Sequence, residues 1–368
     1  MFTAKRTSYA ELARLTIVPV VLGLVAGIAG ALTAESYLAA ESFQVPPPIQ
    51  IGRPSVSVTS PLPETEIAER LRRVNMPLYA RKPAASDVAD RAHSASEIVG
   101  YASVLTSDGW LVTHQAALAG PVSVAVDGRL IEPTAQVVDA RTGAVFLKVD
   151  AAALDVSGFE DTDVLLAGTP LYAAADGGAF AAAVYAGAAP SDKKVPAGSL
   201  RSTDRFSRTF RLDRALGAHA VGSAVLTVGG NLAGIVAPGK DGNDAFIPMH
   251  LIRPVLVGVF RGQEPARAAL GAHYLALGET VFAGQGFDDL TGARLTSSRA
   301  LGLQAVRVGT AAGKAGLQDG DVILAVDEVE ISGGRDLAEL IGEYAPGARA
   351  RFDILRAGER RTVEVTFD

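Results

Sequence analysis

The 368-residue sequence contains no cysteine, which excludes disulfide bonds, zinc–thiolate sites and a thiol nucleophile. Aromatic residues are scarce at 6%, whereas glycine is frequent, with 39 residues. Many turn residues between short apolar runs are typical of folds rich in β-strands. The formal net charge is −6, and no basic stripe with interleaved aromatic residues is present. Composition and charge therefore argue against a nucleic-acid partner.

One long apolar run lies near the N-terminus. Residues 15–34 carry no charge and would be about 30 Å long as a helix, enough to cross a bilayer. Basic residues precede the run and glutamates follow it, so the positive-inside rule places residues 1–14 in the cytoplasm and exports the rest. We expect a retained transmembrane helix over 15–35; a cleaved signal peptide is the alternative.

A spacer follows the apolar run. Residues 43–64 are rich in proline and aperiodic, which indicates an extended segment. Residues 63–75 form a short charged stretch with Ile67 and Leu71 at helical spacing. We assign 36–75 to a spacer with a short helix and expect the globular part to begin at Met76.

Short apolar strands separated by glycine and aspartate turns occupy residues 96–260, which indicates an all-β barrel or sandwich. Four motifs in this region resemble, in order and spacing, the HtrA/Deg branch of the trypsin-like serine proteases. The motifs are SDGWLVT (107–113), DARTGAVFLKV (139–149), GSAVLTVGGNLAGIVA (222–237) and AFIPMHLIRPV (245–255). The resemblance implies a trypsin-like double β-barrel over residues 76–262.

The resemblance also implies where a catalytic triad would lie. The positions of the histidine, the aspartate and the serine are Ala116, Gly143 and Val221, and none of these residues has a reactive group. His114 and Ser223 lie two residues away, which is about 6–7 Å along an extended chain and beyond hydrogen-bonding reach of the expected geometry. The sequence therefore predicts that the chain is not an enzyme and needs no cofactor.

Two histidines leave a metal site open as an alternative. His114 and His219 lie near the two implied catalytic strands, and His219 replaces the first glycine of the implied oxyanion loop. A metal site would need a further ligand such as Asp139 or Asp213. Isolated histidines in loops are more often solvated or singly hydrogen-bonded.

Residues 191–214 are the most polar part of the barrel region, with seven basic and three acidic residues. The pattern favours a solvated β-hairpin with alternating charges; a docking surface is the alternative.

The C-terminal part resembles a PDZ domain, an α+β fold expected over residues 263–368. Its core is AAGKAGLQDGDVILAVDEVEI (311–331), and RDLAELIGEYAPG (335–347) is the expected helix of the ligand groove. PDZ domains bind an extended peptide as an added strand, with backbone N–H groups on its carboxylate. The implied peptide-binding residues are Leu270, Gly271, Ala272, His273 and Tyr274 in the loop, and Leu337, Leu340 and Ile341 on the helix. The ligand is then a peptide C-terminus, an internal segment, or absent.

These features together predict a mostly β protein anchored in the bacterial inner membrane, with its globular domains in the periplasm. We expect a catalytically inactive HtrA-like pseudoprotease, a scaffold or adaptor that binds protein partners through its PDZ and barrel surfaces. It would belong to a membrane complex or form a homo-oligomer. The alternatives are an active HtrA-like periplasmic endopeptidase in protein quality control, and a metal-binding pseudoenzyme.

Overall fold

The computed structural model describes residues 61–82, 92–190, 200–239, 242–279, 291–332 and 334–368. Within these ranges no helix has the length and apolar character needed to cross a bilayer. The expected membrane helix, 15–35, and the spacer before residue 61 lie outside the described residues.

Helix α2 (Glu64–Val74) packs on the globular part rather than belonging to a spacer. Ile67, Leu71 and Val74 recur at helical spacing on one face, and all three are buried in the same core cluster as the barrel strands. The expected start at Met76 is therefore wrong, because burying this apolar face stabilises the helix on the barrel.

The first half of the barrel region is a seven-stranded antiparallel sheet with the order β5-β4-β1-β2-β3-β7-β6. Its strands are β1 (Asn75–Ala80), β2 (Ile98–Val104), β3 (Trp110–His114), β4 (Val122–Val126), β5 (Arg129–Ile131), β6 (Ala135–Asp139) and β7 (Ala144–Lys148). Leu78, Leu111 and Leu147 form part of its fully buried core. Strands β3 and β7 pair from Trp110 opposite Lys148 to His114 opposite Ala144.

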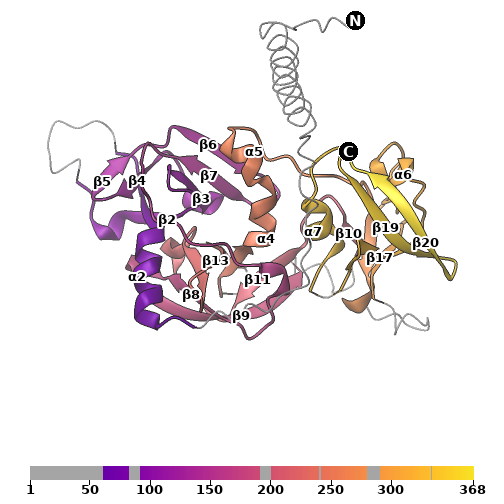
Figure 1. Ribbon diagram of the computed structural model, residues 1–368, viewed down its shortest axis with the longest axis horizontal. Helices are drawn as coiled ribbons and strands as arrows, with labels where there is room; N and C mark the ends of the chain where they lie inside the picture. Colours follow the sequence, from indigo (N-terminus) through magenta and orange to yellow (C-terminus); the bar gives the residue numbers. More distant parts are fainter. Residues whose placement is uncertain (1–60, 83–91, 191–199, 240–241, 280–290, 333) are drawn as a thin grey trace, which may run out of the picture. The chain divides into compact units, whose positions relative to one another are not determined.

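The second half is a closed barrel with the order β11-β14-β13-β12-β8-β9. Its strands are β8 (Pro170–Ala174), β9 (Phe180–Pro190), β11 (Arg208–Leu212), β12 (Ala224–Thr227), β13 (Leu232–Ala237) and β14 (Ala245–Pro248). Helices α4 (Met249–Ile252) and α5 (Leu256–Phe260) follow the last strand. A two-part β-domain, as expected from the sequence, therefore precedes the C-terminal domain (Figure 1).

The C-terminal domain is built on a sheet with the order β10-β15-β16-β17-β19-β20, in which β18 pairs with β17. The elements are β10 (Arg201–Ser202), β15 (His273–Ala276), β16 (Ala293–Leu295), α6 (Ala311–Lys314), β17 (Val322–Val326), β18 (Val329–Glu330), α7 (Leu337–Gly342), β19 (Arg349–Arg356) and β20 (Glu359–Thr366). Tyr274, Ile341 and Phe352 are fully buried in its core. Strand β10 comes from the barrel region of the sequence, so a segment of that region adds an edge strand to the PDZ sheet.

Candidate functional site

The three positions implied for a catalytic triad lie in turns next to the strands that the sequence predicted. Ala116 is in a 3-10 turn (Gln115–Ala117) directly after β3. Gly143 precedes β7 and has a φ of 78°. Val221 is buried and ends the 3-10 turn Ala218–Ala220 before β12. The side chains at these three positions are a methyl group, a hydrogen atom and an isopropyl group.

The His114 side chain lies beside Gly143. A Cβ atom added to Gly143 would be 2.8 Å from His114 Nε2, so the imidazole fills the space that a side chain at position 143 would enter. His114 Nδ1 accepts a hydrogen bond of 3.1 Å from the backbone N–H of Ala116. Burial lowers the pKa of His114, so the ring is neutral at neutral pH.

Ser223 is fully buried and takes part in the packing between the two halves of the barrel. Its Oγ accepts hydrogen bonds from Asn75 Nδ2 at 3.0 Å and from the backbone N–H of Ala174 at 3.1 Å. A hydroxyl–imidazole pair does occur, between Thr162 Oγ1 and His250 Nδ1 at 2.9 Å, but both residues are buried. Neither hydroxyl faces solvent, where a polypeptide would approach.

The implied oxyanion loop is occupied from within the protein. The backbone N–H of His219, at the position of the loop's first glycine, donates a 2.7 Å hydrogen bond to Asp176 Oδ1. The His219 ring lies on the same carboxylate, with Nδ1 3.6 Å from Oδ1. Asp176 therefore holds a donor that an oxyanion hole would need free.

The two-histidine metal hypothesis gains no support in the described ranges. No three histidine, aspartate or glutamate side chains come together there as a metal site. Asp139, one proposed ligand, instead accepts hydrogen bonds from Thr142 Oγ1 at 2.7 Å and Arg267 Nη2 at 2.6 Å. Asp213, the other, accepts from the backbone N–H of Val184 at 2.8 Å.

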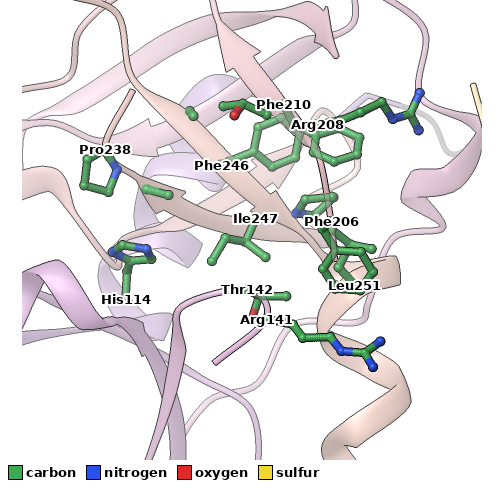
Figure 2. A pocket seen from close by; sticks show the side chains of 14 residues that line it. His114, Arg141, Thr142, Phe206, Arg208, Phe210, Pro238, Phe246, Ile247 and Leu251 are labelled. Carbon is green, nitrogen blue, oxygen red and sulfur yellow. The ribbon is translucent and has the colours of Figure 1, made fainter. Parts of the chain in front are cut away.

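A cavity of about 190 Å³ opens between the two halves of the barrel near His114. Figure 2 shows the imidazole of His114 on one side of this space and the rings of Phe210 and Phe246 on another. Arg141 and Thr142 also line it. The cavity combines apolar walls with a few polar groups, as ligand sites commonly do.

The loop predicted to bind a peptide carboxylate already holds one. The backbone N–H groups of Leu270 and Gly271 both donate to Asp204 Oδ1, each at 3.0 Å. The Ala272 carbonyl accepts a 3.0 Å hydrogen bond from the backbone N–H of Thr203, and the Ala272 N–H donates to Thr203 Oγ1.

The conformation of this loop depends on Gly271. Its φ is 78°, and a Cβ atom added to it would lie 2.4 Å from Thr310. The last two predicted loop residues, His273 and Tyr274, pair with β10.

The apolar residues predicted on the groove helix, at a spacing typical of a buried face, all belong to α7. Leu337, Leu340 and Ile341 of α7 are buried in the core of the PDZ domain. The carboxylates of Asp336, directly before α7, and of Glu339, within it, contact residues 201–208 of the barrel region.

The contacts of α7 with that segment are ion pairs. Arg201 Nη1 is 3.4 Å from Asp336 Oδ1, and Arg208 Nε donates to Glu339 Oε1 at 2.8 Å. All four side chains are at most 5% exposed. The sequence shows arginines in 191–214 and acidic residues in 335–347. No local pattern indicates that these two distant segments form ion pairs with each other.

The prediction of a solvated hairpin over residues 191–214 is therefore wrong for its described part, 200–214. Strand β10 joins the PDZ sheet, β11 joins the barrel, and Arg201 and Arg208 are buried against α7. The segment docks, as the alternative expected, but on its own chain. Residues 191–199 lie outside the described ranges.

Comparisons with known proteins agree with this architecture. Residues 284–367 match the family model described as a PDZ domain. Solved structures of the HtrA-type protease AlgW, one with a decapeptide and one with a tripeptide, superpose with TM-scores of 0.54 and 0.55. Both are 21% identical to this chain, cover 83% of it, and are themselves covered to 98% and 97%. The chain has an HtrA/Deg-like fold. Its trypsin-fold domain precedes a PDZ domain, as the motifs of the sequence implied.

Curated relatives point the same way. The HtrA/Deg-like chain is 27% identical over 302 residues to a probable periplasmic serine endoprotease, DegP-like, of Pseudomonas putida (strain W619). A protein of the same description from Rhizobium meliloti (strain 1021) is 23% identical over 275 residues. The matches cover 79% and 71% of this chain but 59% and 51% of the relatives. The chain thus spans little more than half the length of these relatives.

The comparisons correct one prediction. The sequence alone predicts a chain that is not an enzyme, whereas the curated relatives are named serine endoproteases and the similar structures HtrA-type proteases. These names point to an enzyme. The prediction that the chain is not an enzyme is therefore wrong. The assignment of Ala116, Gly143 and Val221 to the triad positions rests on the motif resemblance.

Proposed function

We propose that this HtrA/Deg-like chain is a periplasmic protein that captures polypeptides, using the groove between β15 and α7 of its PDZ domain. The periplasmic location follows the names of the curated relatives. Two similar structures are those of the HtrA-type protease AlgW with a decapeptide and with a tripeptide, which supports a peptide as the ligand class.

One observation carries the proposal. Two backbone N–H groups, of Leu270 and Gly271, converge on a single carboxylate oxygen at the end of an extended segment paired with β15. Hydrogen bonds to an ionised acceptor are stronger than those between neutral groups. The loop is therefore built to hold a carboxylate at the end of an added strand, the arrangement by which peptides join a sheet edge.

A binding measurement tests this function. The probe is a fluorescein-labelled peptide, Gly-Ser-Leu-Arg-Ser-Thr, which has the sequence of residues 198–203 and a free C-terminal carboxylate. Fluorescence anisotropy with the full chain should show binding, and the C-terminally amidated peptide should bind about tenfold more weakly because it loses charge-assisted hydrogen bonds.

Two glycine variants supply the matched control. Gly271→Ala should abolish binding, because its Cβ would meet Thr310 and distort the loop that presents the N–H groups. Gly278→Ala should bind as the wild type does, because nothing lies within 4 Å of its added Cβ. Equal binding of the acid and the amide would contradict carboxylate recognition.

Serine endopeptidase activity is the second candidate, favoured by the names of the relatives. Such an activity needs a hydroxyl within about 2.6–3.2 Å of a base. The buried hydroxyls of Ser223 and Thr162 are committed to the core, so the reacting serine would lie elsewhere in the chain.

Casein digestion and fluorophosphonate labelling of the full chain test this candidate. Cleavage together with a labelled serine, located by peptide mapping, would establish the enzyme and identify its nucleophile. Absence of both would leave peptide capture as the function.

The uncharged run 15–34 adds a location to the proposal. As a retained helix it would hold the periplasmic domains at the inner membrane, where they could join a membrane complex or a second copy. Carbonate extraction of membranes tests this: a retained anchor leaves the protein in the pellet, and release of a form without residues 1–35 shows a cleaved signal.

A further inference from the structure

The segment Arg201–Asp204 lies in the PDZ groove as a bound peptide would. It runs antiparallel to β15, with Arg201 opposite Tyr274 and Ser202 opposite His273. The pairing continues through the 3.0 Å hydrogen bond from the Thr203 N–H to the Ala272 carbonyl. The strand edge that a peptide would use is thus occupied by the chain itself.

The carboxylate of Asp204 takes the place of a peptide's terminal carboxylate. Its Oδ1 accepts from the N–H groups of Leu270 and Gly271, and its Oδ2 lies 2.5 Å from Arg307 Nη2. Two backbone donors and one guanidinium make up an anion site of the kind that holds free carboxylates. An aspartate side chain and a chain terminus present the same group to it.

We propose that Arg201–Asp204 is an internal ligand of the PDZ groove, and that a peptide in trans must displace it. The proposal rests on the proposed function, because it concerns the same groove. Another ligand can bind only those molecules in which the groove is open. Its apparent dissociation constant is therefore the intrinsic value divided by the fraction of open molecules.

The internal ligand also indicates which peptides compete best. Thr203 stands for the last residue of a peptide, because its N–H reaches the Ala272 carbonyl beside the carboxylate loop. Arg201 lies two residues before it, with its guanidinium 3.4 Å from the carboxylate of Asp336. Asp336 is buried and also accepts from the Tyr274 hydroxyl at 2.7 Å.

A buried carboxylate is costly without a cationic partner. A peptide that displaces Arg201 therefore has to supply a cation of its own at the same place. The groove should select C-terminal peptides with arginine or lysine two residues before the last.

Anisotropy with the full chain and the same fluorescein-labelled peptide tests the proposal. Asp204→Ala removes the carboxylate that holds the internal segment, so the peptide should bind about tenfold more tightly than to the wild type. Arg205→Ala is the matched control, because this neighbouring side chain is exposed. The peptide should bind this variant with the same affinity as the wild type.

A second peptide tests the selectivity. With glutamate in place of arginine, it should bind Asp204→Ala at least about tenfold more weakly, because it faces Asp336 without a cation. Equal binding of the two peptides would overturn the selectivity.

Hydrogen exchange without any peptide separates this proposal from the proposed function. In the wild type the amides of residues 270–272 should be protected, and Asp204→Ala should accelerate their exchange whereas Arg205→Ala should not. Unchanged exchange in Asp204→Ala, or unchanged peptide affinity in a folded variant that does bind, would overturn the internal ligand. Faster exchange with no peptide binding would uphold the internal ligand and contradict peptide capture.

Discussion

The guanidinium of Arg208, on strand β11 of the barrel, forms an ion pair with the carboxylate of Glu339, on helix α7 of the PDZ domain. Arg208 Nε is 2.8 Å from Glu339 Oε1, Nη2 contacts the other carboxylate oxygen, and both side chains are at most 3% exposed. Two hydrogen bonds in a fork geometry join the domains at this point.

Removing one partner of this pair should destabilise the protein. Arg208→Met leaves the Glu339 carboxylate buried without its cation, which should lower the free energy of unfolding by about 3–5 kcal/mol. The double variant Arg208→Met, Glu339→Leu should recover most of the loss, because no buried charge remains. Urea denaturation measures the free energy of unfolding of both variants and of Glu339→Leu, and a loss in the double variant equal to the sum of the two single losses would show that the pair is not coupled.

Stability should fall at acidic pH because of His250. Burial lowers the pKa of this residue from 6.5 to about 3, with a smaller contribution from Arg335. The unfolded chain takes up a proton at its normal pKa while the folded chain does not. The free energy of unfolding should therefore decrease by about 1.4 kcal/mol per pH unit below 6.5, until the pH reaches 3.

The variant His250→Gln tests this contribution. Denaturation curves between about pH 7 and 4.5 should show a shallower decline for the variant, because the proton uptake by this residue in the unfolded chain is gone. The same slope in both proteins would show that His250 titrates normally in the folded state.

Crowding at Gly143 should be measurable against a second glycine with a similar positive φ. Gly143 and Gly128 have φ values of 78° and 73°, but only Gly143 has neighbours within 4 Å of an added Cβ, with His114 Nε2 at 2.8 Å. Gly128→Ala should cost about 1–2 kcal/mol for the left-handed conformation alone. Gly143→Ala should cost more, because His114 has to move; equal losses would show that the ring yields freely.

Replacing Ser223 should affect folding rather than chemistry. Ser223→Ala leaves Asn75 Nδ2 and the N–H of Ala174 without their acceptor, which should cost about 1–3 kcal/mol of stability. Any casein cleavage or fluorophosphonate labelling of the chain should be unchanged, since this hydroxyl is fully buried. Loss of labelling in a folded Ser223→Ala variant would instead make it the nucleophile.

Local patterns in the sequence were sufficient for much of the fold. Strand β17 is formed by the apolar run that follows Gly320-Asp321, within the segment 311–331 that resembles the core of a PDZ domain. Strand β3 likewise follows from its apolar residues and the turn at Gly109, which has a φ of 102°. Turn residues and apolar periodicity act over a few residues, so a single sequence reveals them.

The relations that build the candidate groove are not local. Strand β10 pairs with β15 across about seventy residues of chain, and Asp204 reaches the loop at Leu270 across a similar distance. No short-range pattern marks one aspartate among many as a ligand. The packing of α2 on the core was also missed. Only three of its residues are buried and most of the others are charged, so its composition is that of a solvent-exposed helix.

Photo-crosslinking of the peptide is the most direct test of peptide capture in the PDZ groove. A benzophenone in place of the leucine of Gly-Ser-Leu-Arg-Ser-Thr should crosslink Asp204→Ala within residues 270–276 or 336–343. An excess of the free-acid peptide should abolish the crosslinks, and an excess of the amidated peptide should not. Crosslinks confined to the barrel, or equal competition by both peptides, would contradict the assignment of this groove as the polypeptide-binding site.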